Sequence, residues 1–85
     1  MYQIKYRKSV EKELRKIPSK QLQLIVKKIQ LLADNPFPPQ STSIKGTNFF
    51  RIRHGSYRVV YHVDDQEVII SIIRVAHRKD VYRGI

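Results

Sequence analysis

The chain has 85 residues, and we expect residues 1–85 to form a single domain with a modest core. It lacks cysteine, which excludes disulfides and thiolate metal sites and suits a reducing, cytoplasmic location. Its 17 Lys and Arg residues against 7 Asp and Glu give a net charge of +10, so we expect an anionic partner, either nucleic acid or an acidic protein. The apolar runs are too short to cross a bilayer, and we expect no membrane association.

The N-terminal half predicts one strand and two helices. Residues Tyr2–Tyr6 alternate apolar and polar side chains, which is typical of a strand. Apolar residues at helical spacing predict a short helix over Ser9–Ile17, with Ser9 as its N-cap. A second helix is predicted from Ser19, again an N-cap, to about Asp34. We expect the Lys and Arg residues of this helical hairpin on solvated faces.

A proline-rich connection follows the helices. Three prolines within Asn35–Thr42 remove backbone donors and fix φ, so this stretch is predicted to be irregular. The tripeptide Ile44-Lys45-Gly46 then leads into the predicted sheet. Lys45 is expected to be solvated, within reach of a charged face of that sheet.

The stretch Phe49–Val63 predicts a β-hairpin. Both arms are rich in aromatic and β-branched residues, and a short turn that contains glycine, His54–Ser56, joins them. Side chains alternate along a strand, so the apolar residues of both arms share one face. Arg51, Arg53 and Arg58 would then meet on the opposite face.

Three guanidiniums on one small patch repel one another. Arginine stays charged and binds phosphate bidentately, so the patch is suited to a polyanion. An ordinary solvated face is the alternative, but two arginines alternating with core residues and a third facing them favour a phosphate site. We expect His62 beside the patch, as a weaker candidate for phosphate or proton contact.

A third strand of the meander is predicted over Glu67–Ala76. It is apolar on both faces, which is typical of a central strand. Arg74 is the exception, and simple alternation places it on the same face as Ile70 and Ile72.

The C-terminal segment His77–Ile85 gathers an imidazole, cations and a phenol at a strand end, where functional loops tend to lie. Tyr82 follows Arg78 by four residues, and one helical turn would place both on the same side. A structural hydrogen-bonding role for His77 and a packing role for Tyr82 stay open at this point.

Together these elements predict an α+β fold. An N-terminal strand, a helical hairpin and a three-stranded antiparallel meander would form one small sheet with the helices on one face. This order and three motifs resemble the RelE/ParE toxin superfamily over nearly the whole chain. The motifs are Ile44-Lys45-Gly46, Phe50-Arg51-Ile52-Arg53-His54-Gly55-Ser56-Tyr57-Arg58-Val59-Val60-Tyr61 and Val75-Ala76-His77-Arg78-Lys79-Asp80-Val81-Tyr82.

The RelE-like branch implies the toxin of a type II toxin–antitoxin pair that acts as a ribosome-dependent mRNA endoribonuclease. Its reaction, an attack of the 2′-hydroxyl on the adjacent phosphate, needs no metal or other cofactor. The resemblance implies that Arg58 and Arg78 contact the scissile phosphate and that Arg51 and Arg53 position the RNA backbone. Tyr82 would stack on a base or orient the 2′-hydroxyl.

One departure from the RelE pattern affects the proton transfer. Arg51 and Arg53 stand where the well-studied pattern has lysines, and arginine essentially cannot lose its proton. His77 is therefore the candidate base or acid, because histidine titrates near neutral pH and other RelE-like toxins use one at about this position.

The resemblance also implies partners, namely an acidic, RelB-like antitoxin and mRNA on the ribosome. The antitoxin could cover the arginines or displace the C-terminal segment, with the helical hairpin as a docking surface. Two other functions stay open. A ParE-like toxin has the same fold but poisons DNA gyrase, and a non-enzymatic relic of the fold would only bind RNA or an antitoxin.

Overall fold

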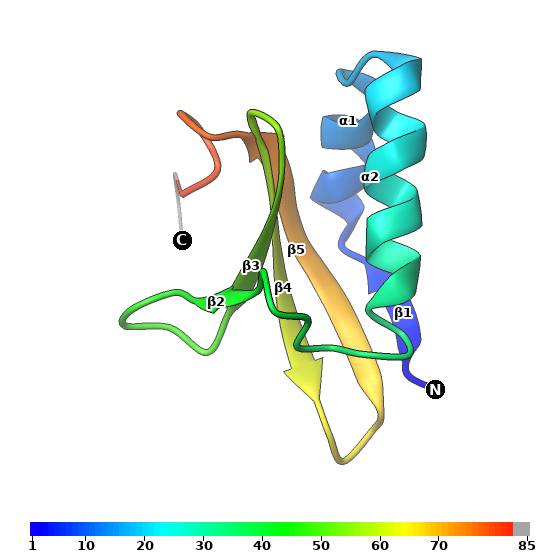
Figure 1. The fold of residues 1–85 in the computed structure, drawn as a ribbon, viewed down its shortest axis with the longest axis vertical. Helices are drawn as coiled ribbons and strands as arrows, with labels where there is room; N and C mark the ends of the chain where they lie inside the picture. The colour runs from blue at the N-terminus through cyan, green and yellow to red at the C-terminus, as the bar shows by residue number, and fades with distance from the viewer. Residues whose placement is uncertain (83–85) are drawn as a thin grey trace.

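The computed structural model describes residues 1–82, in which two helices pack on one five-stranded sheet (Figure 1). The predicted C-terminal segment reaches Ile85, so its residues 83–85 lie outside the described residues. The elements in chain order are β1 (Gln3–Tyr6), α1 (Lys8–Arg15), α2 (Ser19–Leu31), β2 (Thr42–Ser43), β3 (Phe50–His54), β4 (Tyr57–Asp64) and β5 (Ile69–His77).

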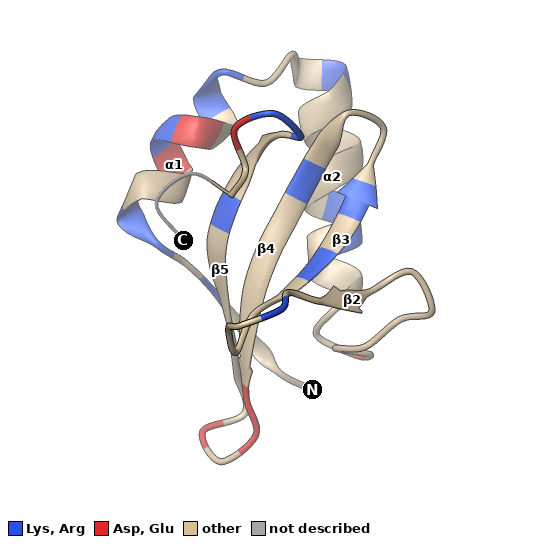
Figure 2. Ribbon diagram, turned by 90° about the vertical axis from the view of Figure 1, so that its left-hand side faces the viewer, with Lys and Arg blue, Asp and Glu red and all other residues tan. Residues whose placement is uncertain are grey.

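The strands are ordered β1-β5-β4-β3-β2 in the sheet. β1 runs parallel to β5, and every other neighbouring pair is antiparallel. Both helices cover the same face of the sheet, so the opposite face, which we call the open face, carries no helix (Figures 1 and 2). The predicted α+β architecture is confirmed, and β5 lies inside the sheet between β1 and β4, as its apolar sequence predicted.

The main core lies between the helices and the sheet. Ile25 of α2 and Ile70 and Ile72 of β5 are fully buried there. Burial of each such side chain contributes about 1.5–3 kcal/mol. Tyr61 is fully buried as well, and its hydroxyl donates to the carbonyl oxygen of Pro36 at 2.6 Å, so its polar atom is satisfied.

A smaller apolar cluster lies on the open face. Its buried members are Val60 of β4, Ile73 of β5 and Val81, and Phe49 packs against them. Because Val81 comes after the end of β5, this cluster holds the C-terminal segment against the sheet.

A β-bulge in β5 changes the direction of Arg74. Tyr61 pairs with Ile72 while Val60 pairs with Arg74, so Ile73 is an extra residue between the two pairs. A bulge interrupts the alternation of side chains. Arg74 therefore lies opposite Val60 on the open face while Ile72 faces the helices, and the prediction that placed both on one face was wrong.

Both predicted N-caps were wrong. Ser9 and Ser19 lie inside α1 and α2. The N-cap positions are Arg7 and Pro18, and neither makes a side-chain cap hydrogen bond. α2 also ends before the predicted Asp34. In the described part of the chain, neither helix has the length and apolar character to cross a membrane.

The β3–β4 hairpin is tighter than predicted. His54 still pairs with Tyr57, so the turn consists only of Gly55 and Ser56. Gly55 has φ +57°, which the two-residue turns of hairpins require and glycine adopts without strain. Thr42, predicted to be irregular, instead pairs with β3 as part of β2.

Candidate functional site

Three arginines lie together on the open face. Arg53 pairs directly with Arg58 across β3 and β4, and Arg51 lies two residues before Arg53 on the same strand. Core residues that face the helices occupy the alternate positions, so all three side chains lie on the side away from them. Figure 2 shows the basic positions of β3 and β4 close to one another on this face.

The backbone of the hairpin turn fixes the guanidinium of Arg58. Its Nη1 donates to the carbonyl oxygen of Gly55 at 2.9 Å and to that of Tyr57 at 3.0 Å. The side chain is half-buried. A guanidinium fixed in this way presents its other N–H donors in a constant direction, which suits contact with phosphate oxygens.

Two contacts bring the C-terminal segment to the arginines. The backbone N–H of Arg78 donates to the carbonyl oxygen of Ser56 at 2.7 Å, which joins the segment to the hairpin turn. Val81 is fully buried in the apolar cluster of the open face. The next residue, Tyr82, keeps 45% of its surface exposed, so its ring is accessible to a ligand.

The arginines and Tyr82 share one electrostatic environment. Burial lowers the pKa of Arg58 below its ordinary value. The charges of Arg53, Arg51 and Arg78 lower this pKa further, whereas Tyr82 acts on it in the opposite direction. Charges that perturb one another in this way repel, and a bound polyanion would relieve the repulsion.

The ring of His77 lies on the other side of the sheet from Arg51, Arg53 and Arg58. It is the last residue of β5 and pairs with Tyr57, whose side chain packs on the helix-facing core. The two rings meet edge to face with centroids 6.1 Å apart. His77 also borders a cavity of about 410 Å³ together with Glu13 and Lys16 of α1. The base predicted from the sequence thus lies on the helix side of the sheet.

The other predicted residues are dispersed. Nε2 of His54 lies 2.7 Å from Oε1 of Gln21, which ties the hairpin to α2. Lys45 is exposed in the loop between β2 and β3. His62 lies on the open face, but four residues along β4 separate it from Arg58, a distance of about 13 Å.

An ion pair that the sequence analysis missed joins α1 to β5, next to the C-terminal segment. Oε2 of Glu13 accepts from Nε of Arg74 at 3.0 Å, and its Oε1 accepts from the backbone N–H of Val75 at 3.0 Å. Nη1 of Arg74 makes longer contacts, of 3.4 and 3.5 Å, with the carbonyl oxygens of Asp80 and Val81. The one sign of this ion pair in the sequence was Arg74, a charged residue inside an otherwise apolar strand.

This arrangement can bind an extended chain of phosphates. It places several guanidiniums and a phenol on one accessible face, where they can stabilise negative charge that develops on a phosphate. Within residues 1–82, no group of three or more His, Cys, Asp or Glu side chains is placed to hold a metal ion.

Comparison with known proteins finds toxins over nearly the whole chain. The family of ParE toxins of type II toxin–antitoxin systems (parDE) matches residues 4–82. A putative RelE-like toxin protein of Escherichia coli is 34% identical over 85 residues, which cover 95% of this chain and 90% of that protein. Toxin RelG of Mycobacterium tuberculosis is 31% identical over 86 residues, which cover 96% of this chain and 97% of that one.

Solved toxin structures share the fold. The toxin–antitoxin complex RelBE2 from Mycobacterium tuberculosis matches with a TM-score of 0.81 at 26% identity, over 91% of this chain and 98% of that one. The archaeal RelE–RelB complex from Pyrococcus horikoshii matches with a TM-score of 0.81 at 28% identity, over 91% of this chain and 94% of that one.

The fold and these matches define the toxin of a type II toxin–antitoxin system. The chain belongs to the RelE/ParE toxin superfamily, and its curated relatives and structural neighbours place it in the RelE-like branch. The resemblance inferred from the three sequence motifs is confirmed.

Proposed function

We propose that this toxin is an endoribonuclease that cuts mRNA on the ribosome. The observation that carries the proposal is the pairing of Arg53 with Arg58, with Arg51 on the same face, at the hairpin turn to which the backbone N–H of Arg78 is bonded. Membership of the RelE-like branch supports the reaction class, because the RelE pattern implies mRNA cleavage. The net charge of +10 supports a polyanionic substrate.

RNA supplies its own nucleophile in this reaction. The 2′-hydroxyl attacks the adjacent phosphorus, the 5′-oxygen leaves, and a 2′,3′-cyclic phosphate and a 5′-hydroxyl remain. The proton lost by the 2′-hydroxyl is balanced by the proton gained by the leaving oxygen. The protein must align the backbone, stabilise charge on the phosphate and transfer these protons.

We assign the charge stabilisation to the arginines. Arg58 and Arg78 would contact the scissile phosphate, and Arg51 and Arg53 would hold the neighbouring backbone. Arg58 suits the first role because two backbone carbonyls fix its guanidinium. Loss of one preorganised group of this kind typically lowers the rate of the chemical step by about 10²- to 10³-fold.

We assign to the Tyr82 hydroxyl the transfer of the proton that the 2′-hydroxyl loses. Tyr82 acts electrostatically on Arg58, whereas the ring of His77 contacts Tyr57 on the helix side. Replacement Tyr82→Phe keeps the ring for stacking and removes the hydroxyl, so it should lower cleavage by about 10²- to 10⁴-fold. Replacement His77→Gln should leave most of the activity, and the opposite result would assign the proton transfer to His77.

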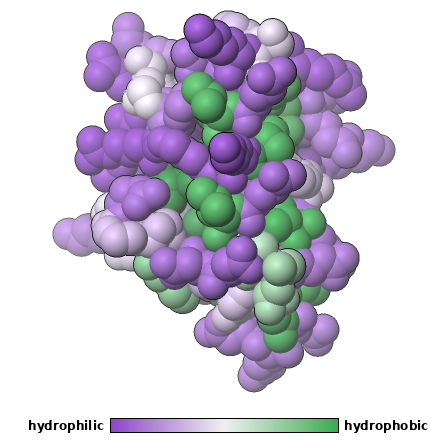
Figure 3. All heavy atoms as spheres, turned by 45° about the vertical axis from the view of Figure 1, so that its right-hand side comes forward, coloured by the Kyte–Doolittle hydropathy of each residue, from purple (hydrophilic) through white to green (hydrophobic). Residues whose placement is uncertain are grey.

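We further propose an acidic, RelB-like antitoxin as the protein partner, because the structural neighbours include RelE–RelB complexes. Figure 3 shows apolar side chains gathered between hydrophilic ones on the side where the helices come forward. Two large apolar side chains of α2 are exposed, Leu24 at 45% and Leu31 at 61%. Such a surface suits an apolar face of the antitoxin, whose acidic residues would neutralise the cationic toxin.

The deciding experiment uses programmed ribosomes that carry a defined mRNA. We expect the purified toxin to cut this mRNA on the ribosome and to leave a 2′,3′-cyclic phosphate. The control, isolated RNA incubated with the toxin and EDTA, should stay intact. Arg58→Ala and Arg78→Ala should abolish the cut. Arg15→Ala is the matched control, because Arg15 is an exposed arginine of α1, on the helix side of the sheet.

Two results would contradict these assignments separately. If folded wild-type toxin leaves mRNA intact with and without ribosomes, the nuclease proposal fails, and DNA gyrase supercoiling becomes the next assay. If cleavage persists in both Arg58→Ala and Arg78→Ala, the toxin is a nuclease with a different site.

A further inference from the structure

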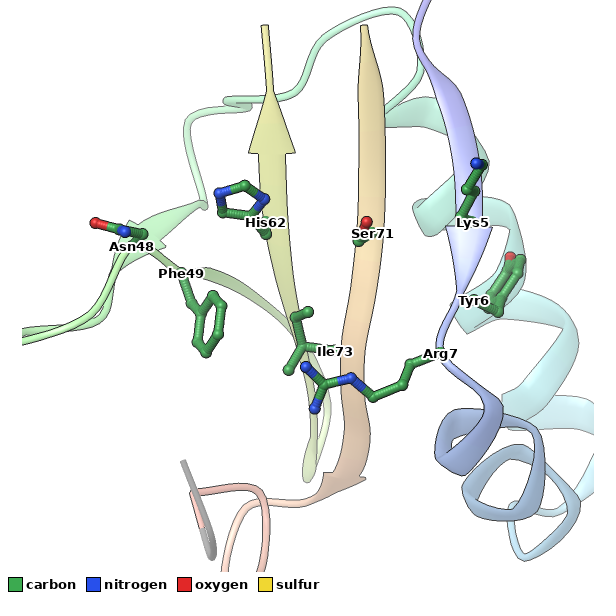
Figure 4. Close-up of a pocket in the computed structure, with 8 residues that line it drawn as sticks. All are labelled: Lys5, Tyr6, Arg7, Asn48, Phe49, His62, Ser71 and Ile73. Atoms are coloured by element: carbon green, nitrogen blue, oxygen red, sulfur yellow. The ribbon is translucent and has the colours of Figure 1, made fainter. Parts of the chain in front are cut away.

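A second cationic site, which is a hollow, lies on the open face beyond the arginines. It is a cavity of about 440 Å³ between β1, β5, β4 and the residues that precede β3 (Figure 4). Its lining consists of Lys5, Tyr6, Arg7, Asn48, Phe49, His62, Ser71 and Ile73.

Strand pairing places the polar residues of this hollow in one row. In the parallel pair, Lys5 of β1 lies beside Ser71 of β5. In the antiparallel pair, Ser71 lies beside His62 of β4. Phe49 closes the row, because its ring meets that of His62 edge to face with centroids 6.3 Å apart. Three strands and the residue before β3 therefore build one continuous floor.

The hollow is positively charged and has an apolar wall. No acidic side chain lines it, and within residues 1–82 neither Lys5 nor Arg7 makes an ion pair. Figure 4 shows the guanidinium of Arg7 reaching across toward Ile73 and the ring of Phe49 on the opposite side. Exposed cations alone are an ordinary surface feature, but here they border a hollow with an aromatic wall.

This hollow adjoins the arginines through the apolar cluster of the open face. Phe49 and Ile73 line the hollow and also pack with Val60 and Val81. Val60 pairs with Arg51, and Val81 precedes Tyr82. A chain bound at the arginines can therefore continue across the cluster into the hollow, which lies about 13 Å along β4 from Arg58.

We propose that this hollow is a second RNA subsite, in which Lys5 and Arg7 each hold a backbone phosphate and Phe49 stacks on a base. Single-stranded RNA fits these groups because its backbone needs cations and its splayed bases stack on aromatic rings. The inference rests on the proposed function, since it takes the RNA bound at the arginines as its ligand. It extends the RNA contact to β1, which carries no predicted site residue.

The charge of the subsite is tested by the salt dependence of RNA binding. The probe is a single-stranded oligonucleotide with 2′-O-methyl riboses, which cannot attack their own phosphates. Each phosphate contact contributes about 0.7 to the slope of log K against log salt for single strands. The double variant Lys5→Gln/Arg7→Gln should therefore lower the slope by about 1.4. The matched control is Lys20→Gln/Lys27→Gln, which removes two exposed charges from α2 and should keep the slope.

The aromatic wall is tested separately. Phe49→Leu retains an apolar side chain, and thermal unfolding shows whether the variant stays folded. Loss of one stacked base should weaken RNA binding about fivefold or more and leave binding of oligoglutamate unchanged. In the wild type, the ring protons of His62 should shift in NMR spectra on addition of the oligonucleotide, and this measurement needs no variant.

The outcomes separate the subsite from the proposed function. The subsite is refuted if Lys5→Gln/Arg7→Gln keeps the salt slope while Arg51→Gln/Arg53→Gln lowers it, and the arginine site then stands. If neither pair changes the slope, the open face does not bind RNA and both proposals fail. If Lys5→Gln/Arg7→Gln weakens binding of RNA and of oligoglutamate equally, and Phe49→Leu has no effect, the hollow is a general anion site and the inference is overturned.

Discussion

Val68 carries backbone strain in the turn between β4 and β5. Within residues 1–82 it is the non-glycine residue with positive φ, +57°. A β-branched side chain in this left-handed region costs about 1–2 kcal/mol. The turn holds the residue in place because its carbonyl oxygen accepts from the backbone N–H of Gln3 at 2.9 Å, which ties the turn to the start of β1.

We expect Val68→Asn to raise the free energy of unfolding by about 1 kcal/mol, because asparagine tolerates this conformation and Val68 is 42% exposed. Urea unfolding measures the change. Gly46→Val is the reverse control. Gly46 has φ +79°, and a Cβ there would meet no atom within 4 Å, so a loss of stability would report strain alone. Equal stability of Val68→Asn and wild type would contradict this account.

His54 has a structural role, and its protonated form is unfavourable in the folded protein. With Gln21 Oε1 as acceptor, Nε2 of His54 is the donor, and Nδ1 is buried with no hydrogen-bond partner in the described part of the chain. A proton on Nδ1 would bury an N–H without an acceptor. Burial accordingly lowers the pKa of His54 below its ordinary value, and the nearby charge of Lys28 lowers it further.

This shift predicts a pH dependence of stability. The unfolded histidine takes up its proton near pH 6.5 and the folded one at lower pH, so between the two values the unfolded state holds more protons. The free energy of unfolding should therefore fall as pH decreases below about 6.5. Urea unfolding at a series of pH values tests this, and His54→Gln should reduce the slope. An unchanged slope in that variant would show that other groups cause it.

At the scale of elements, α1 completes the sheet where β1 ends. β1 stops at Tyr6, whose partner on β5 is Ile72, but β5 continues to His77. The outer edge of β5 beyond the bulge therefore lacks a strand partner. Glu13 of α1 supplies the acceptor for the Val75 N–H there, and the same carboxylate binds Arg74.

We expect Glu13→Ala to lower the free energy of unfolding by about 1–3 kcal/mol, because it leaves the backbone N–H of the buried Val75 and the Nε of Arg74 without their acceptor. Under the proposed function it should also lower mRNA cleavage, since Arg74 contacts the carbonyls that precede Tyr82. Urea unfolding and single-turnover cleavage measure the two effects. Glu11→Ala, an exposed carboxylate of the same helix, should change neither. A Glu13→Ala variant as stable and active as Glu11→Ala would show that the contacts of Glu13 with Arg74 and Val75 do not support the site.

At the scale of the whole molecule, the two sides of the sheet have different surfaces. The open face carries the arginines and the cationic hollow. The helix side carries exposed apolar residues of α2. This separation would let an antitoxin dock on one side while its acidic segments reach the other, and it makes docking and cleavage separable by mutation.

We expect Leu31→Glu to weaken binding of the cognate antitoxin about tenfold or more, because it places a charge in an apolar contact. Cleavage by the free toxin should stay close to wild type, since Leu31 lies on α2. Titration calorimetry with the antitoxin and the ribosome assay measure the two activities. Gln23→Glu adds the same charge at another exposed position of α2 and serves as the control. Unchanged affinity in Leu31→Glu would place the antitoxin elsewhere.

The sequence by itself determined the kinds and order of the main elements and the alternation of Arg51 and Arg53. These features follow from local geometry, because hydrophobic periodicity and turn residues act between near neighbours in the chain. The helix caps were less predictable. Ser9 and Ser19 are good cap residues, yet the backbone entered each helix one or two residues earlier.

Only the tertiary structure decided which distant residues meet. The bulge at Ile73 turned Arg74 to the open face, and the pairing of His77 with Tyr57 placed the predicted base on the helix side. The parallel pairing of β1 with β5 set Lys5 in one row with His62. The physical reason is that strand register depends on packing between segments far apart in the chain, and a shift of one residue moves every later side chain to the other face.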